Sequence, residues 1–264
     1  MKLSSPEQLF NIRDRVALVS GALGAFGAVA ARTLSQAGCK LVIADQNETA
    51  LNDLAAELRQ AGAAVEVVTL WPDSEENCSR IVADTVAAYG KLDILVVANG
   101  TTDNDDIVDM ELQRFEEVMR VNVSLSWLMS KAAGRQMIEQ GGGGKVVLVS
   151  SARGLLGHPS GYSAYCSSKH AVNGVVKALG CEWGKHNITI NALAPTVFRS
   201  NLTGWMFEDN ERATSTRDGI LSRIPLGRLG EPEDLAGPLL FLVSPASDFH
   251  TGHTIYADGG YTAG

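Results

Sequence analysis

A tyrosine and a lysine stand four residues apart in the segment GYSAYCSSKHAV, as Tyr165 and Lys169. The apolar residues that follow have helical period, so this spacing predicts that phenol and ammonium share one helix face, one turn apart. A free tyrosine has a pKa of about 10 and is a poor base at neutral pH, but a fixed cation beside it favours the phenolate. We expect Ser151 to end the strand that begins near residue 145, with Ser150 pointing the other way because side chains alternate along a strand. Hydroxyl, phenol and ammonium around one oxygen atom would form a proton-transfer site.

A glycine-rich stretch, SGALGAFG, spans residues 20–27. Its glycines (Gly21, Gly24 and Gly27) fall three apart, so the dinucleotide spacing G-x-G-x-x-G is absent. The stretch follows a predicted strand and opens a predicted helix, and in that context backbone N–H groups and a helix N-terminus face a pyrophosphate. A tight turn without a ligand is the alternative interpretation.

An aspartate supports the nucleotide interpretation. Asp45 ends the second predicted strand, KLVIAD, where a carboxylate can accept hydrogen bonds from both ribose hydroxyls of an adenosine. It would also repel a 2′-phosphate, and Gln46 and Asn47 rather than a lysine or arginine follow it. We therefore expect NAD rather than NADP, although a solvated aspartate at a strand end is a common feature by itself.

Short apolar runs alternate with segments of helical period along the whole chain. Predicted strands begin near residues 15, 40, 64, 92, 145, 188 and 254, and a typical predicted helix covers Glu48 to Gln60. Near-continuous apolar strands are typical of sheets covered on both faces, and alternation with helices indicates right-handed βαβ units. The fold predicted is α/β, a Rossmann-like, doubly wound, mostly parallel seven-stranded sheet flanked by helices. We expect a single domain over residues 1–264, with a lid or binding loop at about 196–230.

Composition excludes several classes of protein. The 264 residues are 45% hydrophobic and 20% charged, which is typical of a folded soluble chain, and the formal charge of −8 argues against nucleic-acid binding. The four cysteines lie far apart without C-x-x-C spacing, which favours a reduced, cytoplasmic setting and no metal site. The N-terminus has no signal-peptide core, and the longest uncharged run (residues 16–31) is too short for a membrane span.

Together these motifs resemble the short-chain dehydrogenase/reductase family of the single-domain, NAD(P)-binding type, over nearly the whole chain. The catalytic tetrad of that family is a serine, the tyrosine and lysine of Y-x-x-x-K, and an asparagine on the fourth helix; the matching positions are Asn122, Ser151, Tyr165 and Lys169. The resemblance implies that Tyr165 is the acid/base and that Ser151 orients the substrate oxygen. It also implies that Lys169 lowers the tyrosine pKa and holds the nicotinamide ribose, while Asn122 anchors a water. The closing segment, RIPLGRLGEPEDLAGPLLFLVS to GHTIYADGG, is similar to one that builds the subunit interface of a homotetramer in this family.

The chain also departs from the family pattern. The glycine motif T-G-x-x-x-G-x-G has Ala25 at its middle glycine, N-N-A-G is VANG from Val97 to Gly100, and Trp71 or Pro72 stands where an acidic residue usually caps the adenine, with Asp73 close by. The remaining matches predict cofactor contacts at Gly21, Gly24, Phe26, Gly27, Asp45, Asn99, Tyr165, Lys169, Pro195 and Val197.

Two alternatives to an active enzyme of this type are disfavoured by the residues present. A cofactor-binding pseudoenzyme is disfavoured because all four tetrad positions survive while the changes affect scaffold positions. A dehalogenase-like relative, which lacks the lysine and the nicotinamide, is disfavoured by Lys169 and Asp45. We predict an NAD(H)-dependent oxidoreductase that interconverts a secondary alcohol and a ketone.

Arginines near the expected pocket indicate a polar small-molecule substrate. Arg153, His158 and Arg199 are the candidate contacts, because guanidinium groups suit carboxylate, phosphate or sulfonate recognition. A sugar, sugar acid or hydroxy acid would fit; surface arginines paired with acids are the plainer interpretation. Trp205, Met206 and Phe207 leave open an apolar lid, and with it an NADP(H)-dependent reductase of an alicyclic or aromatic ketone or of a 3-oxoacyl thioester.

Overall fold

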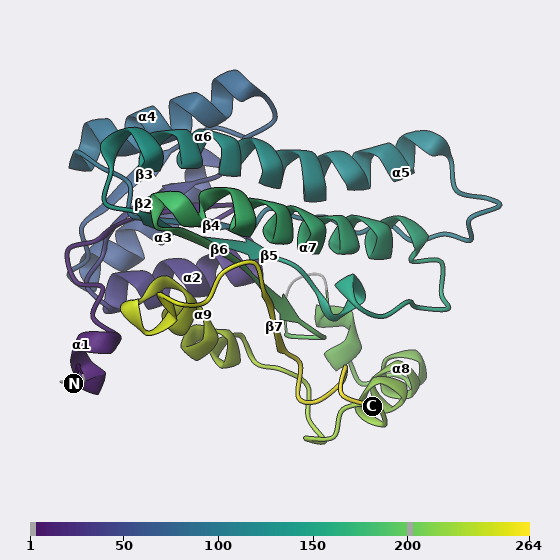
Figure 1. Ribbon diagram of the computed structural model, residues 1–264. Helices are drawn as coiled ribbons and strands as arrows, with labels where there is room; N and C mark the ends of the chain where they lie inside the picture. The colour runs from purple at the N-terminus through teal and green to yellow at the C-terminus, as the bar shows by residue number, and fades with distance from the viewer. Residues whose placement is uncertain (1–3, 200–202) are drawn as a thin grey trace.

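The computed structural model describes residues 4–199 and 203–264, and within them seven strands form one parallel sheet (Figure 1). The strand order is β3-β2-β1-β4-β5-β6-β7, and every neighbouring pair is parallel. The strands are β1 (Val16–Ser20), β2 (Lys40–Ala44), β3 (Val65–Val68), β4 (Ile94–Val97), β5 (Gly144–Val149), β6 (Ile188–Pro195) and β7 (Thr254–Ala257). The predicted fold class is confirmed.

The strand order reverses direction at β1. From β1 the chain first builds outward through β2 and β3, and it then returns to place β4 on the other side, so that Ser20 pairs with Ala44 and with Val97. In open α/β sheets such a switch point leaves a crevice at the carboxyl ends of the strands, where ligands bind. The glycine-rich stretch begins at this point.

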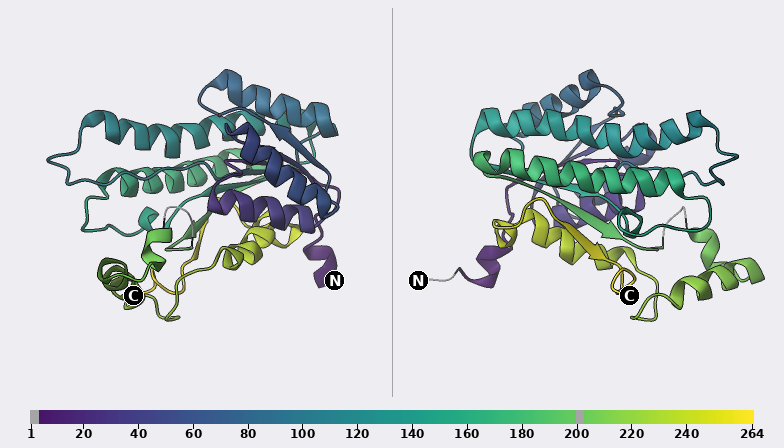
Figure 2. Two further views of the ribbon diagram at one scale, coloured as in Figure 1. Left: turned by 180° about the vertical axis from the view of Figure 1, so that it is seen from behind. Right: turned by 45° about the vertical axis from the view of Figure 1, so that its right-hand side comes forward.

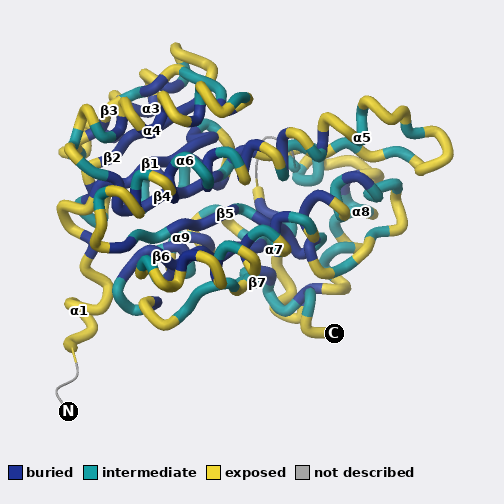
Figure 3. The backbone as a smooth tube through the Cα atoms, turned by 45° about the horizontal axis from the view of Figure 1, so that its top comes forward, coloured by how far each residue is buried: buried dark blue, intermediate teal, exposed yellow. Residues whose placement is uncertain are grey.

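Helices cover both faces of the sheet (Figure 3). Side chains of α2 (Ala25–Gln36), α3 (Glu48–Gln60) and α9 (Ala236–Val243) pack in one apolar cluster, together with Ala17 and Val19 of β1. Side chains of α4 (Glu75–Tyr89), α6 (Leu125–Gln140) and α7 (Ser163–Trp183) pack in the other, together with Leu18. Alternate residues of β1 thus enter different cores, which explains why the strand is apolar at almost every position.

The helix predicted over Glu48 to Gln60 forms with those bounds. Its buried side chains are the ones that the 3.6-residue period places on one face: Leu51, Leu54, Ala55 and Leu58. Asn47 caps the helix by accepting a hydrogen bond from the Ala50 N–H at 3.1 Å.

One long helical rod on the second face contains an irregular turn (Figure 1). It consists of α5 (Leu112–Met119), a π-helical turn (Arg120–Ser124) and α6, without a break in the helical backbone. A π-turn holds one residue more than an α-turn and often occurs at functional sites.

The expected binding loop, at about 196–230, contains helical elements of its own. They are the 3-10 helix η4 (Gly204–Phe207) and α8 (Glu211–Leu221), while residues 200–202 lie outside the described residues. A bridge between Phe198 and Gly230 joins the two ends of the segment, and the Gly230 N–H donates to the Val197 carbonyl at 3.0 Å. Figure 2 shows α8 standing off from the sheet, next to the C-terminus.

The remaining elements are short: α1 (Pro6–Leu9) and the 3-10 turns η2 (Ala152–Gly154), η3 (Gly184–His186), η5 (Pro232–Leu235) and η6 (Pro245–Ser247). Among the helices of the described ranges, none is both long and apolar enough to cross a membrane.

Candidate active site

Two of the three glycines in the stretch after β1 are required by its backbone. Gly21 has a φ of +75°, and a Cβ atom added there would lie 2.6 Å from the backbone nitrogen of Asn99. A Cβ on Gly27 would overlap the carbonyl oxygen of Gly21. The turn therefore packs backbone against backbone, which side chains at these positions would prevent.

Gly24 and Ala25 occupy less demanding positions. Gly24 is the N-cap of α2 with a φ of −67°, and its added Cβ would come no closer than 3.4 Å to any neighbour. Ala25 begins the helix, and its side chain is exposed. An alanine in place of the family's middle glycine therefore strains neither the backbone nor the packing of this loop.

The N-terminus of α2 is open toward the carboxyl edge of the sheet. Gly24 offers no side-chain cap, and the first turn contains no acidic residue. The first N–H groups of a helix have no intrahelical acceptors and carry the positive end of its dipole, so together they can bind a phosphate. The Phe26 side chain is buried in the core, so that residue can contact a cofactor only through its backbone.

Asp45 is buried beside this loop. Its carboxylate accepts hydrogen bonds from the Gln46 N–H at 2.8 Å and from the Leu23 N–H at 3.3 Å. No lysine or arginine of the described residues lies within 4 Å of it, so its charge remains available to a ligand. The carboxylate is held at the position expected for a ribose contact.

Asn99 supplies a further polar group. Its Oδ1 accepts a hydrogen bond from Ser20 Oγ at 2.6 Å, while its buried Nδ2 has no partner within the described part of the chain. A buried donor without a partner carries a free-energy cost that a ligand can relieve. Together, the open helix end, the close-packed Gly21 and this donor fit a dinucleotide cofactor.

Of the two residues that could stand where the family usually has an acid near the adenine, Trp71 is half-buried and Pro72 is buried, both after β3. Asp73, the nearby acid, is exposed and accepts a hydrogen bond from Asn77 Nδ2 at 2.8 Å. Asp73 therefore interacts with the first turn of α4.

The Ser151 hydroxyl lies close to Tyr165 and lowers the pKa of its phenol. Contrary to the prediction, Ser151 does not end β5, because that strand ends at Val149. Ser151 instead caps the short helix η2, and its hydroxyl accepts a hydrogen bond from the backbone N–H of Arg153 at 3.1 Å. Ser150 faces away, as predicted, and donates to the Lys169 carbonyl at 3.4 Å.

Lys169 and Asn122 lie next to this pair. Lys169 Nζ donates to the Val149 carbonyl at 3.0 Å and lies 5.6 Å from the centre of the Tyr165 ring. A Cβ on Gly100 would lie 3.3 Å from Asn122 Oδ1 and 3.6 Å from Lys169 Nζ, so both side chains reach the same glycine.

Asn122 is fully buried in the π-helical turn and satisfies several partners. Its Nδ2 donates to the Thr101 carbonyl and to Ser168 Oγ, both at 2.9 Å, and its Oδ1 accepts from the Thr101 N–H at 2.8 Å. Asn122 therefore fixes the chain after β4 against α7. The structure brings all four predicted tetrad residues together.

Burial dominates the titration of the two central groups. It raises the pKa of Tyr165 above its usual value, and the hydrogen bond with Ser151 opposes the rise. Burial also lowers the pKa of Lys169 to about 8. The expected lowering of the tyrosine pKa by Lys169 is not found in this structure, and Tyr165 is a neutral phenol at neutral pH. A neutral phenol is poised to donate a proton.

Arg153 and His158, two predicted substrate contacts, lie near the tetrad. The His158 ring packs against Tyr162, with 4.6 Å between ring centres, and Tyr162 packs against Tyr165 at 6.2 Å. Burial lowers the pKa of His158, and the charges of Arg153 and Arg223 lower it further. At neutral pH this ring is uncharged.

Arg199, the third predicted substrate contact, is placed differently. Its guanidinium lies 3.9 Å from the centre of the Phe207 ring and 3.7 Å from a Glu231 carboxylate oxygen. Pro195 ends β6 and Val197 follows it, both half-buried on the way to the same segment.

Arg223 and Tyr261 near the site were not anticipated from the sequence, and neither were the partner serines Ser20 and Ser168. Ser20 stands in the glycine-rich stretch itself, and Ser168 stands one residue before the predicted lysine, so their neighbours in sequence carried the signal. Arg223 begins the closing segment quoted above and Tyr261 follows its end, but both are distant in sequence from the tetrad and reach the site only through tertiary folding.

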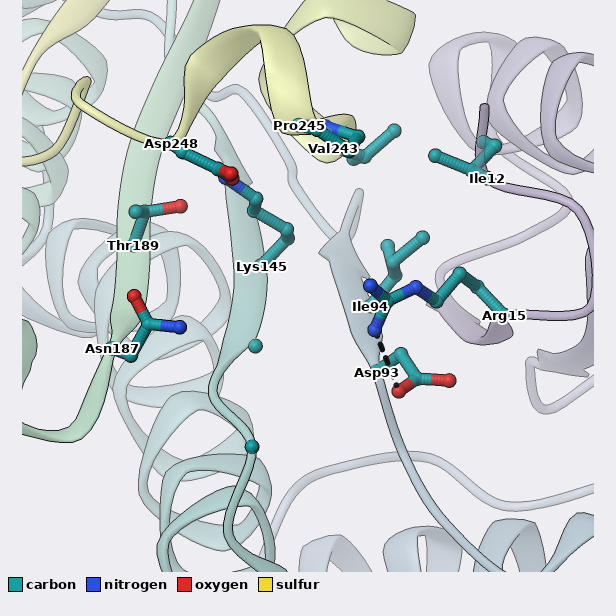
Figure 4. Close-up of a pocket in the computed structure, with 12 residues that line it drawn as sticks. Ile12, Arg15, Asp93, Ile94, Lys145, Asn187, Thr189, Val243, Pro245 and Asp248 are labelled. Carbon is teal, nitrogen blue, oxygen red and sulfur yellow. Dashed lines mark hydrogen bonds and ion pairs between the residues drawn. The ribbon is translucent and has the colours of Figure 1, made fainter. Parts of the chain in front are cut away.

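A cavity of about 110 Å³ lies at the opposite, amino-terminal edge of the sheet (Figure 4). Its charged side chains are already paired: Arg15 with Asp93 at 3.3 Å, and Lys145 with Asp248 at 2.8 Å. None of the predicted tetrad or cofactor residues lines it. The candidate active site is therefore at the carboxyl edge.

Comparison with known proteins agrees with this geometry. Residues 21–262 match the family described as enoyl-(acyl carrier protein) reductase. An uncharacterized oxidoreductase of Mycobacterium tuberculosis (strain ATCC 25618 / H37Rv) is 47% identical, over 96% of this chain and 93% of the relative. The 2-dehydro-3-deoxy-D-gluconate 5-dehydrogenase of Dickeya dadantii (strain 3937) is 36% identical, over 96% and 98%. The crystal structure of a gluconate 5-dehydrogenase from Burkholderia cenocepacia J2315, in complex with NADP and tartrate, superposes with a TM-score of 0.91 at 29% identity, over 98% of this chain and all of that one.

Proposed function

The chain belongs to the short-chain dehydrogenase/reductase family, and from that premise we propose that it interconverts a secondary alcohol and a ketone with NAD(H). It is an oxidoreductase of this family with a nicotinamide cofactor, and the proposal adds the residue roles, the choice of NAD and the class of substrate. When bound, the cofactor supplies or accepts the hydride at the substrate carbon.

The single observation that carries the proposal is the grouping of three side chains: Ser151 lowers the pKa of the Tyr165 phenol, and Lys169 Nζ lies 5.6 Å from the centre of the Tyr165 ring. Two hydroxyl groups held together can both contact one substrate oxygen. In the direction of reduction, the Tyr165 phenol donates its proton to that oxygen as the alcohol forms, and Ser151 donates a hydrogen bond to it. In the direction of oxidation, Tyr165 takes the proton back.

Lys169 and Asn122 support this exchange. The Lys169 ammonium, which is hydrogen-bonded to the Val149 carbonyl below the tyrosine ring, stabilises a phenolate once the proton has left. We assign it also to the nicotinamide ribose, as the family resemblance implies. Asn122 holds the chain after β4 through both of its hydrogen bonds with Thr101, and so keeps Gly100 close to the ammonium.

The preference for NAD rests on Asp45. A carboxylate held by the Leu23 and Gln46 N–H groups would accept the two ribose hydroxyls of NAD and repel the 2′-phosphate of NADP. The gluconate 5-dehydrogenase from Burkholderia cenocepacia was crystallised with NADP, so the choice is not uniform among similar proteins. Affinities of the wild-type protein and of Asp45→Asn for NADH and NADPH test it. We expect the wild type to bind NADH more tightly and the variant to lose that preference; a clear wild-type preference for NADPH would contradict the role of Asp45.

A polar substrate fits the arginines of the segment after β6 that lie on its aromatic side chains. The aromatic side chains that could form an apolar lid have guanidinium groups near their rings, Arg212 4.9 Å from the centre of Trp205 and Arg199 near Phe207. We therefore favour a sugar acid or hydroxy acid over an alicyclic ketone. A homotetramer, as the family resemblance implies, in the cytoplasm, as the cysteine pattern favours, completes the proposal.

The decisive experiment is Tyr165→Phe, with Tyr89→Phe on α4 as the matched control. NAD⁺-linked absorbance would be followed over a panel of sugars, sugar acids, hydroxy acids and alicyclic alcohols. Loss of the phenol should lower kcat by about 10²–10⁴-fold, the usual contribution of a general acid–base group, while NADH binding measured by fluorescence persists. The control should keep wild-type turnover. Undiminished turnover in Tyr165→Phe would overturn the mechanism.

A further inference from the structure

We propose that Arg153 and Arg223, whose guanidinium groups both lie near the ring of Tyr261, form a subsite for a carboxylate group of the substrate. This inference rests on the proposed function, because that function makes the bound anion a substrate. The geometry of the anion site itself does not depend on turnover. The three residues come from η2, from the segment just after α8 and from the chain after β7.

The two arginines converge on one aromatic ring. The guanidinium carbon of Arg153 lies 5.2 Å from the centre of the Tyr261 ring, and that of Arg223 lies 4.4 Å from it. Arg153 Nη2 also donates to the Tyr261 hydroxyl at 2.8 Å, and its Nη1 donates to the Gly157 carbonyl at 2.9 Å. Tyr261 is only 3% exposed, so it is a fixed platform.

Neither arginine has an acidic partner. Over residues 4–199 and 203–264, no carboxylate lies within 4 Å of Arg153 or Arg223, whereas Arg199 and Arg228 are paired with Glu231 and Asp234. The partners of Arg153 are a carbonyl and a phenol, both neutral. Two like charges gathered on one ring without a counter-ion repel each other, and an anion between them would relieve that repulsion.

The arginine pair lies beside the proposed reaction centre. The Arg153 N–H donates to Ser151 Oγ, one of the two hydroxyl groups assigned to the substrate oxygen. The charge of Arg153 also acts on Tyr165, whose pKa it lowers slightly against the larger effect of burial. We infer that a substrate with its reacting carbon at Tyr165 extends toward the Arg153 guanidinium and, along the shared Tyr261 ring, toward that of Arg223.

The donors suit a carboxylate. Guanidinium groups present N–H donors in a planar fork that matches two carboxylate oxygens. The Tyr261 hydroxyl accepts from Arg153, so its own hydrogen remains free to donate to the same anion. A hydroxy acid or sugar acid, with a carboxylate several atoms from the reacting carbinol, combines these requirements.

His158 provides a readout inside the subsite. Its pKa is lowered by burial and by the charges of Arg153 and Arg223, so an anion bound between the arginines should raise it. Its Nδ1 accepts from the Ser160 N–H at 3.2 Å, and its ring lies on Tyr162. The ring protons of His158 can be followed by NMR, with the spectrum of His158→Gln for assignment.

The binding experiment uses tartrate and its neutral counterpart threitol on the full chain without cofactor. Tartrate should raise the pKa of His158 in the wild type and in Arg80→Gln, which removes an arginine of α4 that pairs with Asp84 away from the site. It should not raise that pKa in Arg223→Gln, and threitol should have no effect on any of the three proteins. An equal shift in Arg223→Gln, or no shift in the wild type, would overturn the proposal.

The kinetic experiment separates this proposal from the proposed function. With D-gluconate as the acid and D-glucitol as the neutral alcohol, Arg223→Gln should raise KM for the acid by about 10–100-fold, the range of a charge-assisted hydrogen bond, and leave kcat within about threefold. KM for the alcohol should not change. Equal effects on both compounds would refute the subsite while leaving the oxidoreductase activity in place. Absence of turnover with every compound would refute the proposed function, and the His158 titration would still decide the subsite.

Discussion

Replacing Lys169 by methionine should make the protein more stable while removing its activity. The lysine is 3% exposed, and its ammonium has one protein acceptor, the Val149 carbonyl, and no acidic partner within the described ranges. Methionine has a similar length and no charge, so it can occupy the same space. The cost of burying the ammonium is then absent from the folded state.

The magnitude follows from the titration of the lysine. Burial lowers its pKa from 10.5 to about 8, which corresponds to about 3 kcal/mol at about 1.4 kcal/mol for each tenfold change in the ionisation constant. The variant leaves the Val149 carbonyl without its donor, at a cost of about 1 kcal/mol. The free energy of unfolding should therefore rise by about 2 kcal/mol at pH 7.

The gain should depend on pH in a definite direction. Below pH 8 the lysine is protonated in both the folded and the unfolded state, so the wild type carries the full cost of burial. As pH rises from about 8 to 10.5, the folded state releases its proton first and the cost disappears. The advantage of Lys169→Met should shrink over that interval.

Urea denaturation of the cofactor-free protein at pH 7 and at pH 9.5 measures both effects. Lys177→Met, on the exposed side of the same helix, is the matched control and should change stability by less than about 0.5 kcal/mol. A destabilised Lys169→Met, or a gain of equal size at both pH values, would refute the reasoning.

Two further predictions concern the glycine loop and the tyrosine. Gly21→Ala should destabilise the protein by more than about 1 kcal/mol and abolish NADH binding, because Gly21 has a φ of +75° and the added methyl group would meet the Asn99 backbone. Gly24→Ala should retain both wild-type stability and NADH binding. Thermal melts and NADH titrations compare the two variants, and equal behaviour would contradict this account. Because burial raises the pKa of Tyr165, alcohol oxidation should speed up continuously from about pH 7 to 9 while ketone reduction stays level from about pH 6 to 8. A kcat for oxidation that is already constant at pH 7 would show that the phenol titrates lower in the working enzyme.

The helices and strands could be predicted from the sequence wherever the buried apolar residues recur with the period of a helix or a strand. The segment from Glu48 to Gln60 has its leucines on one face, and its predicted and observed bounds agree. Tyr165 and Lys169 share a helix because their spacing is local. Such features are determined by residues that are close together in the sequence, so the sequence alone is enough to predict them.

Other features depend on contacts between distant segments. The apolar run and β5 both end at Val149, but nothing in the two serines that follow shows that Ser151 caps η2 instead of ending the strand. Burial of the two side chains, and not the spacing of Tyr165 and Lys169, dominates their pKa values, and burial is set by the whole fold. Arg223 reaches Tyr261 only after the segment following β6 has closed, so no spacing in the sequence reports the contact.

The π-helical turn at Arg120–Ser124 has a consequence for the length of the chain. One extra residue in the rod turns α5 by about 100° about the helix axis relative to α6, so that α5 packs against α7 while α6 packs against α4. Deleting a single residue between these positions would restore a uniform helix and rotate every side chain on one side of the cut out of phase with its partners. Substitutions along this rod leave its length unchanged, whereas an insertion or deletion of one residue would separate Asn122 from either Thr101 or Ser168.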